Sequence, residues 1–228
     1  MGIIIGERLF CEKLRRSDAT SRCSWLLRVG NGEGCENAML GMKKILVIGS
    51  GGSGKSTFAK RLGAVLELEV IHLDAIYWSS GWVEMPKDKW RVVVEELLRR
   101  DSWIMDGNYG GTLDVRLAAC DAVIFLDVPR LVCLRRVLKR RALYRKKSRP
   151  DMAAGCDEKL SWEFLKWVWN YPSKKKPAVL EKLKSYSETK PVIILRSDSE
   201  IESFLGELSH SLRPRKELSN VDGETALV

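Results

Sequence analysis

A glycine-rich run in the chain combines the residue types and the spacing needed to hold a phosphate group. From Gly49 to Thr57 the sequence reads G-S-G-G-S-G-K-S-T, which fits the pattern G-x-x-x-x-G-K-S. Glycines allow successive backbone N–H groups to turn towards one anion. In such a loop Lys55 is expected to reach the β- and γ-phosphates of ATP, and the Ser56 hydroxyl is expected to ligate Mg²⁺.

The residues on either side of this run provide the elements that position such a loop. Residues 45–48 (ILVI) are typical of a buried strand, and residues 58–62 (FAKRL) are typical of a helix. The strand aims the loop, and the helix offers its unpaired N–H groups and the positive end of its dipole to the phosphates. The order of strand, glycine loop and helix therefore predicts a phosphate-binding P-loop.

Further apolar runs alternate with helical patterns along the rest of the chain. We expect more strands near residues 69–73, 102–105, 122–126 and 191–195. We expect helices over residues 90–100, from Pro129 onward, over about 158–170 with a stop near Pro172, and over about 198–208. The alternation predicts a three-layer α/β fold, in which a five-stranded parallel sheet is covered by helices on both faces.

Three aspartates follow expected strands, at the edge of the sheet where ligands bind in such folds. Asp106 is the preferred metal ligand, together with Ser56. Asp74 opens an aromatic stretch, and two interpretations stand side by side: it orients or deprotonates an acceptor hydroxyl, or it caps a helix. Asp127 also fits a magnesium site, although Pro129 makes a helix cap equally natural there. His72 is expected to be a core or edge residue.

The net charge of +9 is concentrated in one segment, because residues 130–150 contain ten Arg or Lys and no Asp or Glu. Arg136 and Arg140 are four residues apart on an expected helix and so share a face. Guanidinium groups match phosphate oxygens well, so we assign this pair to catalysis in an arginine-rich lid over about 136–157. The remaining basic residues, Lys146 and Lys147 among them, indicate a solvated surface or weak nucleic-acid binding.

The ends of the chain differ in composition from its middle. We expect residues 1–41 to be a poorly ordered extension, residues 42–208 to form the working domain, and residues 209–228 to be a flexible tail. The six cysteines form no C-x-x-C pair and are expected to be reduced, which favours a cytoplasmic location. No apolar run approaches the length that a membrane span requires.

Two segments resemble motifs of the adenylate kinase-like P-loop kinases. Residues 104–109 (IMDGNY) resemble the third-strand motif L-D-G-F-P, and residues 126–141 resemble the motif F-D-V-P followed by an R-x-x-x-R helix. A narrower resemblance links residues 42–208 to a bacterial family of DNA topology modulation proteins. It rests on the motifs I-G-S-G-G-S-G-K-S-T, H-L-D-A-x-Y-W, D-G-N-Y, V-L-K-R-R, R-P-D-M and W-E-F-L-K-W-x-W-N.

The resemblance implies a role for each matching residue. Arg136 would cover the adenine, Arg140 would reach the transferring phosphoryl group, and Arg149 would be a further lid arginine. Asp106 would hold Mg²⁺, and Ser197 falls where such kinases hold the adenine edge. The residues expected to hold the ATP phosphates are Gly49, Gly51, Gly52, Ser53, Gly54, Lys55, Ser56 and Thr57.

The chain departs from the kinase pattern on the acceptor side. Nucleoside monophosphate kinases carry a Pro-Arg pair after the D-G-F motif, and that arginine grips the acceptor phosphate, whereas in this chain residues 108–111 (NYGG) occupy the place. Asn108, Arg116 and Asp74 are therefore the candidate acceptor residues, with Arg116 as the substitute phosphate ligand. The sequence favours an ATP-dependent kinase that acts on a small molecule or a nucleotide. The alternative is a nucleic-acid-associated regulator that uses ATP as a switch.

Overall fold

The computed structural model describes residues 39, 41–144, 151–157 and 161–212. Within this part of the chain, five parallel strands form one sheet in the order β2-β5-β1-β6-β7. This confirms the predicted parallel sheet. The strands are β1 (Lys44–Gly49), β2 (Val70–His72), β5 (Trp103–Asp106), β6 (Ala122–Leu126) and β7 (Val192–Leu195).

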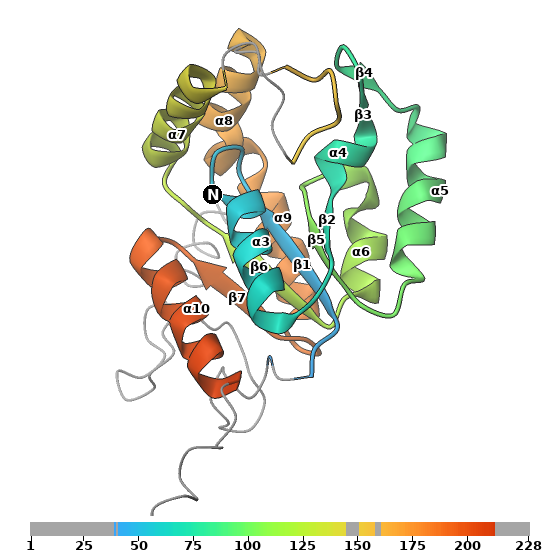
Figure 1. Ribbon diagram of the computed structural model, residues 1–228, viewed down its shortest axis with the longest axis vertical. Coiled ribbons are helices and arrows are strands. Elements are labelled where there is room, and N and C mark those ends of the chain that lie inside the picture. The colour runs from blue at the N-terminus through green and yellow to red at the C-terminus, as the bar shows by residue number, and fades with distance from the viewer. Residues whose placement is uncertain (1–38, 40, 145–150, 158–160, 213–228) are drawn as a thin grey trace, which may run out of the picture.

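Helices cover both faces of the sheet (Figure 1). Helices α3 (Lys55–Leu66) and α10 (Asp198–Leu212) pack on one face. The opposite face is covered by α5 (Lys87–Leu98), α6 (Leu113–Ala119) and α9 (Lys176–Tyr186). Side chains alternate along β1, so that Ile45 and Val47 enter the first core while Leu46 and Ile48 enter the second. Because both faces are buried, the strands are almost uniformly apolar, as expected for a three-layer α/β fold.

Two further groups of elements stand at the carboxyl edge of the sheet. Helices α7 (Arg130–Leu143) and α8 (Trp162–Lys174) pack against each other on one side of the P-loop. The short helix α4 (Leu73–Tyr77) leads into a hairpin of β3 (Trp78–Ser79) and β4 (Val83–Glu84) on the other side (Figure 1). This arrangement leaves the P-loop between an arginine-rich wall and an aromatic one.

The structure corrects several expected boundaries. The strand expected over residues 69–73 is only three residues long, because Leu73 already begins α4. Helix α8 begins at Trp162, after Ser161 caps it by accepting a hydrogen bond from the Phe164 N–H at 3.0 Å. The helix continues through Pro172, near which it was expected to stop, and ends at Lys174. The sequence-based expectations did not include α9, whose first turn contains a proline, or the β3–β4 hairpin.

The core begins before Met42, the expected start of the working domain. The Met39 side chain is fully buried in the core cluster around α3 and α10. Residues 1–38, most of the expected N-terminal extension, lie outside the described residues, as do residues 213–228 of the expected tail. Helix α10 runs to Leu212, beyond the expected domain end at residue 208. No helix in the described ranges is long and apolar enough to cross a membrane.

Candidate functional site

Backbone geometry requires glycine at the P-loop positions that join β1 to α3. Gly52 and Gly54 have φ angles of 77° and 96°, a region that favours glycine. A Cβ atom at Gly52 would lie 2.4 Å from the Cys133 carbonyl oxygen, and one at Gly49 would lie 2.6 Å from the Leu126 carbonyl oxygen. The loop backbone therefore packs directly against the backbone of neighbouring segments. With no side chains at the glycines, its N–H groups are the groups that can contact a ligand.

Two serine hydroxyls of the same loop, those of Ser50 and Ser53, are buried without a hydrogen-bond partner. Buried polar atoms without partners are uncommon in proteins and call for a missing ligand or water. Together with glycines that admit no side chain, they fit a loop built to receive an anion. Phosphate binding by residues 49–57 stays a prediction, and the loop geometry is compatible with it.

Lys55 is half-buried in the loop, and its ammonium group donates a hydrogen bond to the Ser50 carbonyl at 3.0 Å. Burial lowers the pKa of Lys55 from its ordinary value, while the carboxylates of Asp106 and Asp74 oppose that change. The ammonium group therefore lies within electrostatic reach of both aspartates. A cation held in this way faces the place where phosphate oxygens would lie.

One cavity of about 1120 Å³ brings most of the expected site residues together. Its lining includes these predicted residues: Gly51, Gly52, Ser53, Gly54, Lys55, Ser56, Thr57, Asp74, Asn108, Arg136 and Arg140. Gly49, Asp106, Arg116 and Ser197 lie outside the lining, and Arg149 lies outside the described residues. Residues from the two ends of the described domain thus meet around one space.

Asp106 ends β5 just outside the cavity lining and is only 3% exposed. Its Oδ2 atom lies 2.7 Å from the Nδ1 atom of His72, which ends the neighbouring strand β2. His72 therefore orients the carboxylate. A hydroxyl and a carboxylate are oxygen ligands of the kind that Mg²⁺ prefers, so Ser56 and Asp106 fit the expected metal site. Among the described residues, no three His, Cys, Asp or Glu side chains cluster as a metal site made by protein ligands alone.

Asp127, the other candidate magnesium ligand, forms an ion pair. Its Oδ2 atom accepts a hydrogen bond from the Lys176 ammonium group at 2.7 Å, which ties α9 to the end of β6. The cap residue of α7 is Pro129, and no side chain bonds to that helix end. Asp127 therefore acts in an ion pair between elements, which neither sequence interpretation had included.

The two α7 arginines that line the cavity, Arg136 and Arg140, reach different parts of it. The Arg136 guanidinium group donates to the Ser53 carbonyl at 3.0 Å and pairs with Asp198 at the start of α10. The Arg140 guanidinium group lies 5.8 Å from the centre of the Phe164 ring and interacts electrostatically with Lys55. Arg136 thus joins the P-loop to α10, whereas Arg140 faces the lysine end of the site.

Arg116 does not bind an acceptor, and the expectation that it replaces the missing phosphate ligand is wrong. Its side chain is fully buried, and its guanidinium group donates to the backbone carbonyls of Gly107, Asn108, Tyr109 and Thr112 at 2.7–3.3 Å. Burial lowers the pKa of Arg116 to about 10. The arginine instead holds the loop that follows Asp106 in shape.

Asn108 and Ser197 also make contacts that differ from the expected ones. The Asn108 amide exchanges two hydrogen bonds with Gly49: its nitrogen donates to the Gly49 carbonyl at 2.6 Å, and its oxygen accepts from the Gly49 N–H at 3.1 Å. Ser197 accepts a hydrogen bond from the Glu200 N–H at 3.2 Å and so caps α10. Asn108 therefore braces the P-loop, and Ser197 positions the neighbouring cavity residue Asp198.

Asp74 occupies the first turn of α4 and does not cap it, because the cap residue is His72. Its Oδ1 atom accepts a hydrogen bond from the Tyr109 hydroxyl at 2.6 Å. Burial and the nearby Asp74 carboxylate raise the pKa of Tyr109, so its hydroxyl remains a donor. Of the two sequence interpretations, the cap is wrong, and the carboxylate instead faces the cavity.

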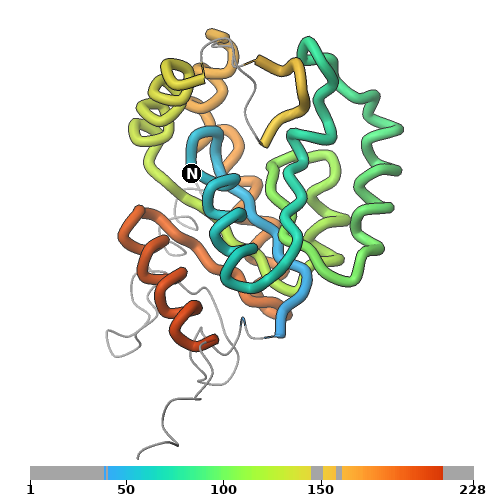
Figure 2. The backbone as a smooth tube through the Cα atoms, in the orientation of Figure 1, coloured from blue at the N-terminus to red at the C-terminus, as the bar shows by residue number. Residues whose placement is uncertain are grey.

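The hairpin beside Asp74 is joined to residues 151–157, part of the expected lid. The Gly81 N–H donates to the Gly155 carbonyl at 3.0 Å, and the Trp82 indole N–H donates to the Asp157 carbonyl at 2.8 Å. The Cys156 thiol donates to the Ser79 carbonyl at 3.1 Å. Figure 2 shows this segment alongside the hairpin at the carboxyl edge of the sheet. These contacts tie residues 151–157 to the hairpin beside the cavity.

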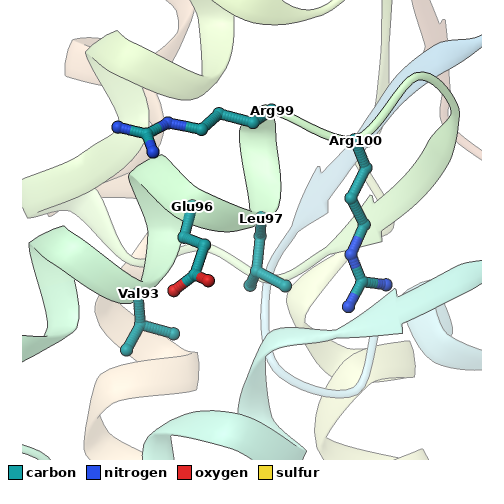
Figure 3. Close-up of a pocket in the computed structure, with 5 residues that line it drawn as sticks. All are labelled: Val93, Glu96, Leu97, Arg99 and Arg100. Carbon is teal, nitrogen blue, oxygen red and sulfur yellow. The ribbon is translucent and has the colours of Figure 1, made fainter.

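A second cavity, of about 620 Å³, lies at the opposite end of the sheet and is lined by Val93, Glu96, Leu97, Arg99 and Arg100 (Figure 3). It is formed by the end of α5 and the turn that leads into the start of β5. Arg99 and Arg100 point in different directions there (Figure 3), and Arg100 pairs with Glu69 at 2.8 Å. This cavity is separated from the P-loop by the length of the strands.

Several solved structures that resemble the chain are kinases. No family model and no curated protein sequence matches it significantly. A gluconokinase from Sinorhizobium meliloti 1021 is 14% identical, with 74% of this chain and 90% of that chain covered and a TM-score of 0.45. A shikimate kinase from Acinetobacter baumannii in complex with shikimate is 18% identical, with 78% and 99% covered and a TM-score of 0.48.

A deoxyadenosine kinase from M. mycoides, solved with dCMP and dCDP as products, is 17% identical. It covers 73% of this chain and 98% of its own, with a TM-score of 0.39. At these identities and TM-scores, the similarity assigns neither an activity nor a substrate to this chain.

Proposed function

We propose that the protein is an ATP-dependent phosphotransferase that moves the γ-phosphoryl group of ATP to a small-molecule or nucleotide acceptor. One observation carries this proposal: the P-loop, the two α7 arginines and Asp74 line a single cavity. A P-loop alone would serve a motor or a switch equally well. A carboxylate within electrostatic reach of the P-loop lysine adds a place for a reacting hydroxyl.

Different residues of the chain have different roles in the proposed phosphoryl transfer. The loop amides and Lys55 bind the phosphates, and Arg140 neutralises charge that develops on the transferring group. Arg136 and the start of α10 line the part of the cavity where we place the nucleoside of ATP. Asp74 orients the acceptor hydroxyl and accepts its proton, while residues 151–157 help to exclude water. When Mg²⁺ is bound, held by Ser56 and Asp106, it supplies charge neutralisation on the phosphates.

The proposal is tested by measuring ADP formation in a coupled assay while candidate acceptors are added one at a time. A panel of nucleosides, nucleoside monophosphates and small hydroxylated metabolites covers the chemistry of the cavity. The proposal requires at least one acceptor to raise ADP formation well above the rate with ATP alone. ATP binding without stimulation by any panel member would overturn it.

The regulator that uses ATP as a switch is the competing proposal, along with the narrower resemblance to DNA topology modulation proteins. It draws on the basic residues of α7 that do not line the cavity, such as the exposed Arg130 and Arg135. A salt titration of DNA binding separates the two proposals, because phosphate contacts give a steep dependence on salt. The kinase proposal expects Asp74→Asn to abolish transfer whether or not DNA binds. A cytoplasmic location is part of the kinase proposal.

A further inference from the structure

The acceptor half of the cavity carries negative charge. It comprises Asp74, Trp78, Trp82, Glu84 and the loop residues 107–109. Two of these side chains are carboxylates, and none of the described residues of this half is a lysine or an arginine. Arg116, which the sequence had suggested as an acceptor ligand, is buried beneath the loop, where its hydrogen bonds go to backbone carbonyls. This half therefore contrasts with the cationic half around Lys55 and Arg140.

Aromatic rings form one wall of the acceptor half. The rings of Trp78 and Trp82 lie 5.4 Å apart at an interplanar angle of 67°, and Tyr77 packs edge-on against Trp78 at 5.2 Å. Trp82 has a φ of 66°, a strained conformation for a bulky residue. Its indole N–H is held by the Asp157 carbonyl, so the strained position is fixed by residues 151–157. Flat faces of this kind suit a ring-shaped ligand with an apolar face.

The carboxylate of Asp74 connects this aromatic wall to the phosphate end of the cavity. It is fixed by the Tyr109 hydroxyl on one side and interacts electrostatically with Lys55 on the other. A ligand hydroxyl that donates to Asp74 would therefore lie beside the P-loop. Glu84, held by the Tyr77 hydroxyl at 3.1 Å, offers a second acceptor for ligand hydroxyl groups.

Building on the proposed kinase function, we propose that the acceptor is an uncharged molecule with several hydroxyl groups and a flat ring face, not a phosphorylated one. Carboxylates accept hydrogen bonds from hydroxyl groups and repel phosphate. The ring face stacks on one of the two indoles, Trp78 or Trp82, which lie at 67° to each other, and the reacting hydroxyl donates to Asp74. Nucleosides and cyclic sugars both have this chemistry.

Matched pairs of probes test the acceptor class by binding alone, without ATP. Tryptophan fluorescence titrations compare adenosine with AMP, thymidine with TMP, and glucose with glucose 6-phosphate. The uncharged member of at least one pair is expected to bind about 10-fold more tightly than its phosphorylated partner, equivalent to about 1.4 kcal/mol. The nucleoside pairs and the sugar pair show which source supplies the ligand. Equal or tighter binding of every phosphorylated member, or no binding of any probe, would overturn the proposal.

Charge-removing variants show whether the carboxylates cause the preference. Asp74→Asn with Glu84→Gln is expected to reduce the preference for the uncharged member to within about twofold, since repulsion of phosphate is lost. Glu181→Gln, an exposed carboxylate on α9, is the matched control and should leave the preference unchanged. An unchanged preference in the double variant would contradict the proposal.

The coupled ADP assay, run with the same pairs, separates this inference from the proposed function. Transfer to AMP or TMP but not to the nucleosides would keep the kinase and reject the uncharged acceptor. Binding of an uncharged probe without any transfer would keep the acceptor class and reject the kinase.

Discussion

The two halves of the cavity are built by different means. Most of the phosphate half comes from one continuous stretch, the P-loop, whose backbone is fixed by glycines that tolerate no Cβ, and α7 adds arginine side chains to it. The acceptor half comes from α4, the β3–β4 hairpin and the loop after β5, and its ligand groups are side chains. Backbone recognition follows from local sequence, whereas side-chain recognition depends on how distant segments pack. The half that defines the chemistry is therefore easier to predict than the half that defines the substrate.

The largest effect is expected at the cationic centre of the phosphate half. Lys55→Ala should lower the rate of ATP turnover by about 10²–10³-fold, because a preorganised charge aimed at the transferring group is lost. Steady-state kinetics measure the rate, and thermal melting should show an intact fold. Lys89→Ala, an exposed lysine on α5, is the control. If the Lys55→Ala variant turned over ATP at the wild-type rate, the role proposed for the phosphate half would be wrong.

The buried arginine beneath the acceptor half should matter for stability. Arg116→Met should lower the free energy of unfolding by about 3 kcal/mol, because several loop carbonyls lose a charged donor. Urea denaturation measures the change, with the exposed Arg99→Met as control. If Arg116→Met unfolds like the wild type but weakens binding of a phosphorylated acceptor, the corrected role of this residue is itself mistaken.

Glycine geometry gives a sharp test of backbone recognition. Gly52→Ala should cost about 2 kcal/mol of stability and weaken nucleotide binding, because it combines a φ of 77° with a Cβ placed 2.4 Å from the Cys133 carbonyl. Gly111→Ala meets nothing within 4 Å and is the matched control. Thermal melting with and without ATP measures both effects. Equal behaviour of the two variants would show that the loop is less constrained than its geometry indicates.

A smaller effect is expected where the two halves join. Asn108→Ala removes both hydrogen bonds to Gly49 and should weaken ATP binding about fivefold. Calorimetry measures the affinity, and Asn170→Ala on α8 is the control. If Asn108→Ala instead changes the acceptor KM and leaves ATP affinity intact, the residue belongs to the acceptor, as the sequence first suggested.

The fold was predictable where apolar runs are long and uninterrupted. Strands β1, β5, β6 and β7 appear within a residue or two of their expected positions, because each is buried on both faces. The β3–β4 hairpin was missed, since two strands of two residues each leave no alternating pattern. Helix α9 was missed because the lysine-rich stretch around Pro177 lacks a clear apolar stripe, although a proline in the first turn is a recognisable start signal.

The residues of the site also differ in how far the sequence predicts their roles. Residues 49–57 and Asp74 could be placed at one edge of the sheet from sequence, because the carboxyl ends of parallel strands meet there. The role of Arg116 could not be inferred, since nothing in the sequence shows that a charged side chain is buried and bonded to carbonyls. The pairing of Lys176 with Asp127 joins residues far apart in the chain and depends on the packing of α9.

The most direct test of the proposed function follows the γ-phosphoryl group itself. Wild-type protein is incubated with Mg²⁺, ATP labelled at the γ-phosphate and the acceptor panel, and the labelled products are separated. We expect label to appear in a covalently phosphorylated small molecule, and Lys55→Ala to prevent its formation. Label found only as inorganic phosphate, or only in unreacted ATP, would contradict a phosphotransferase.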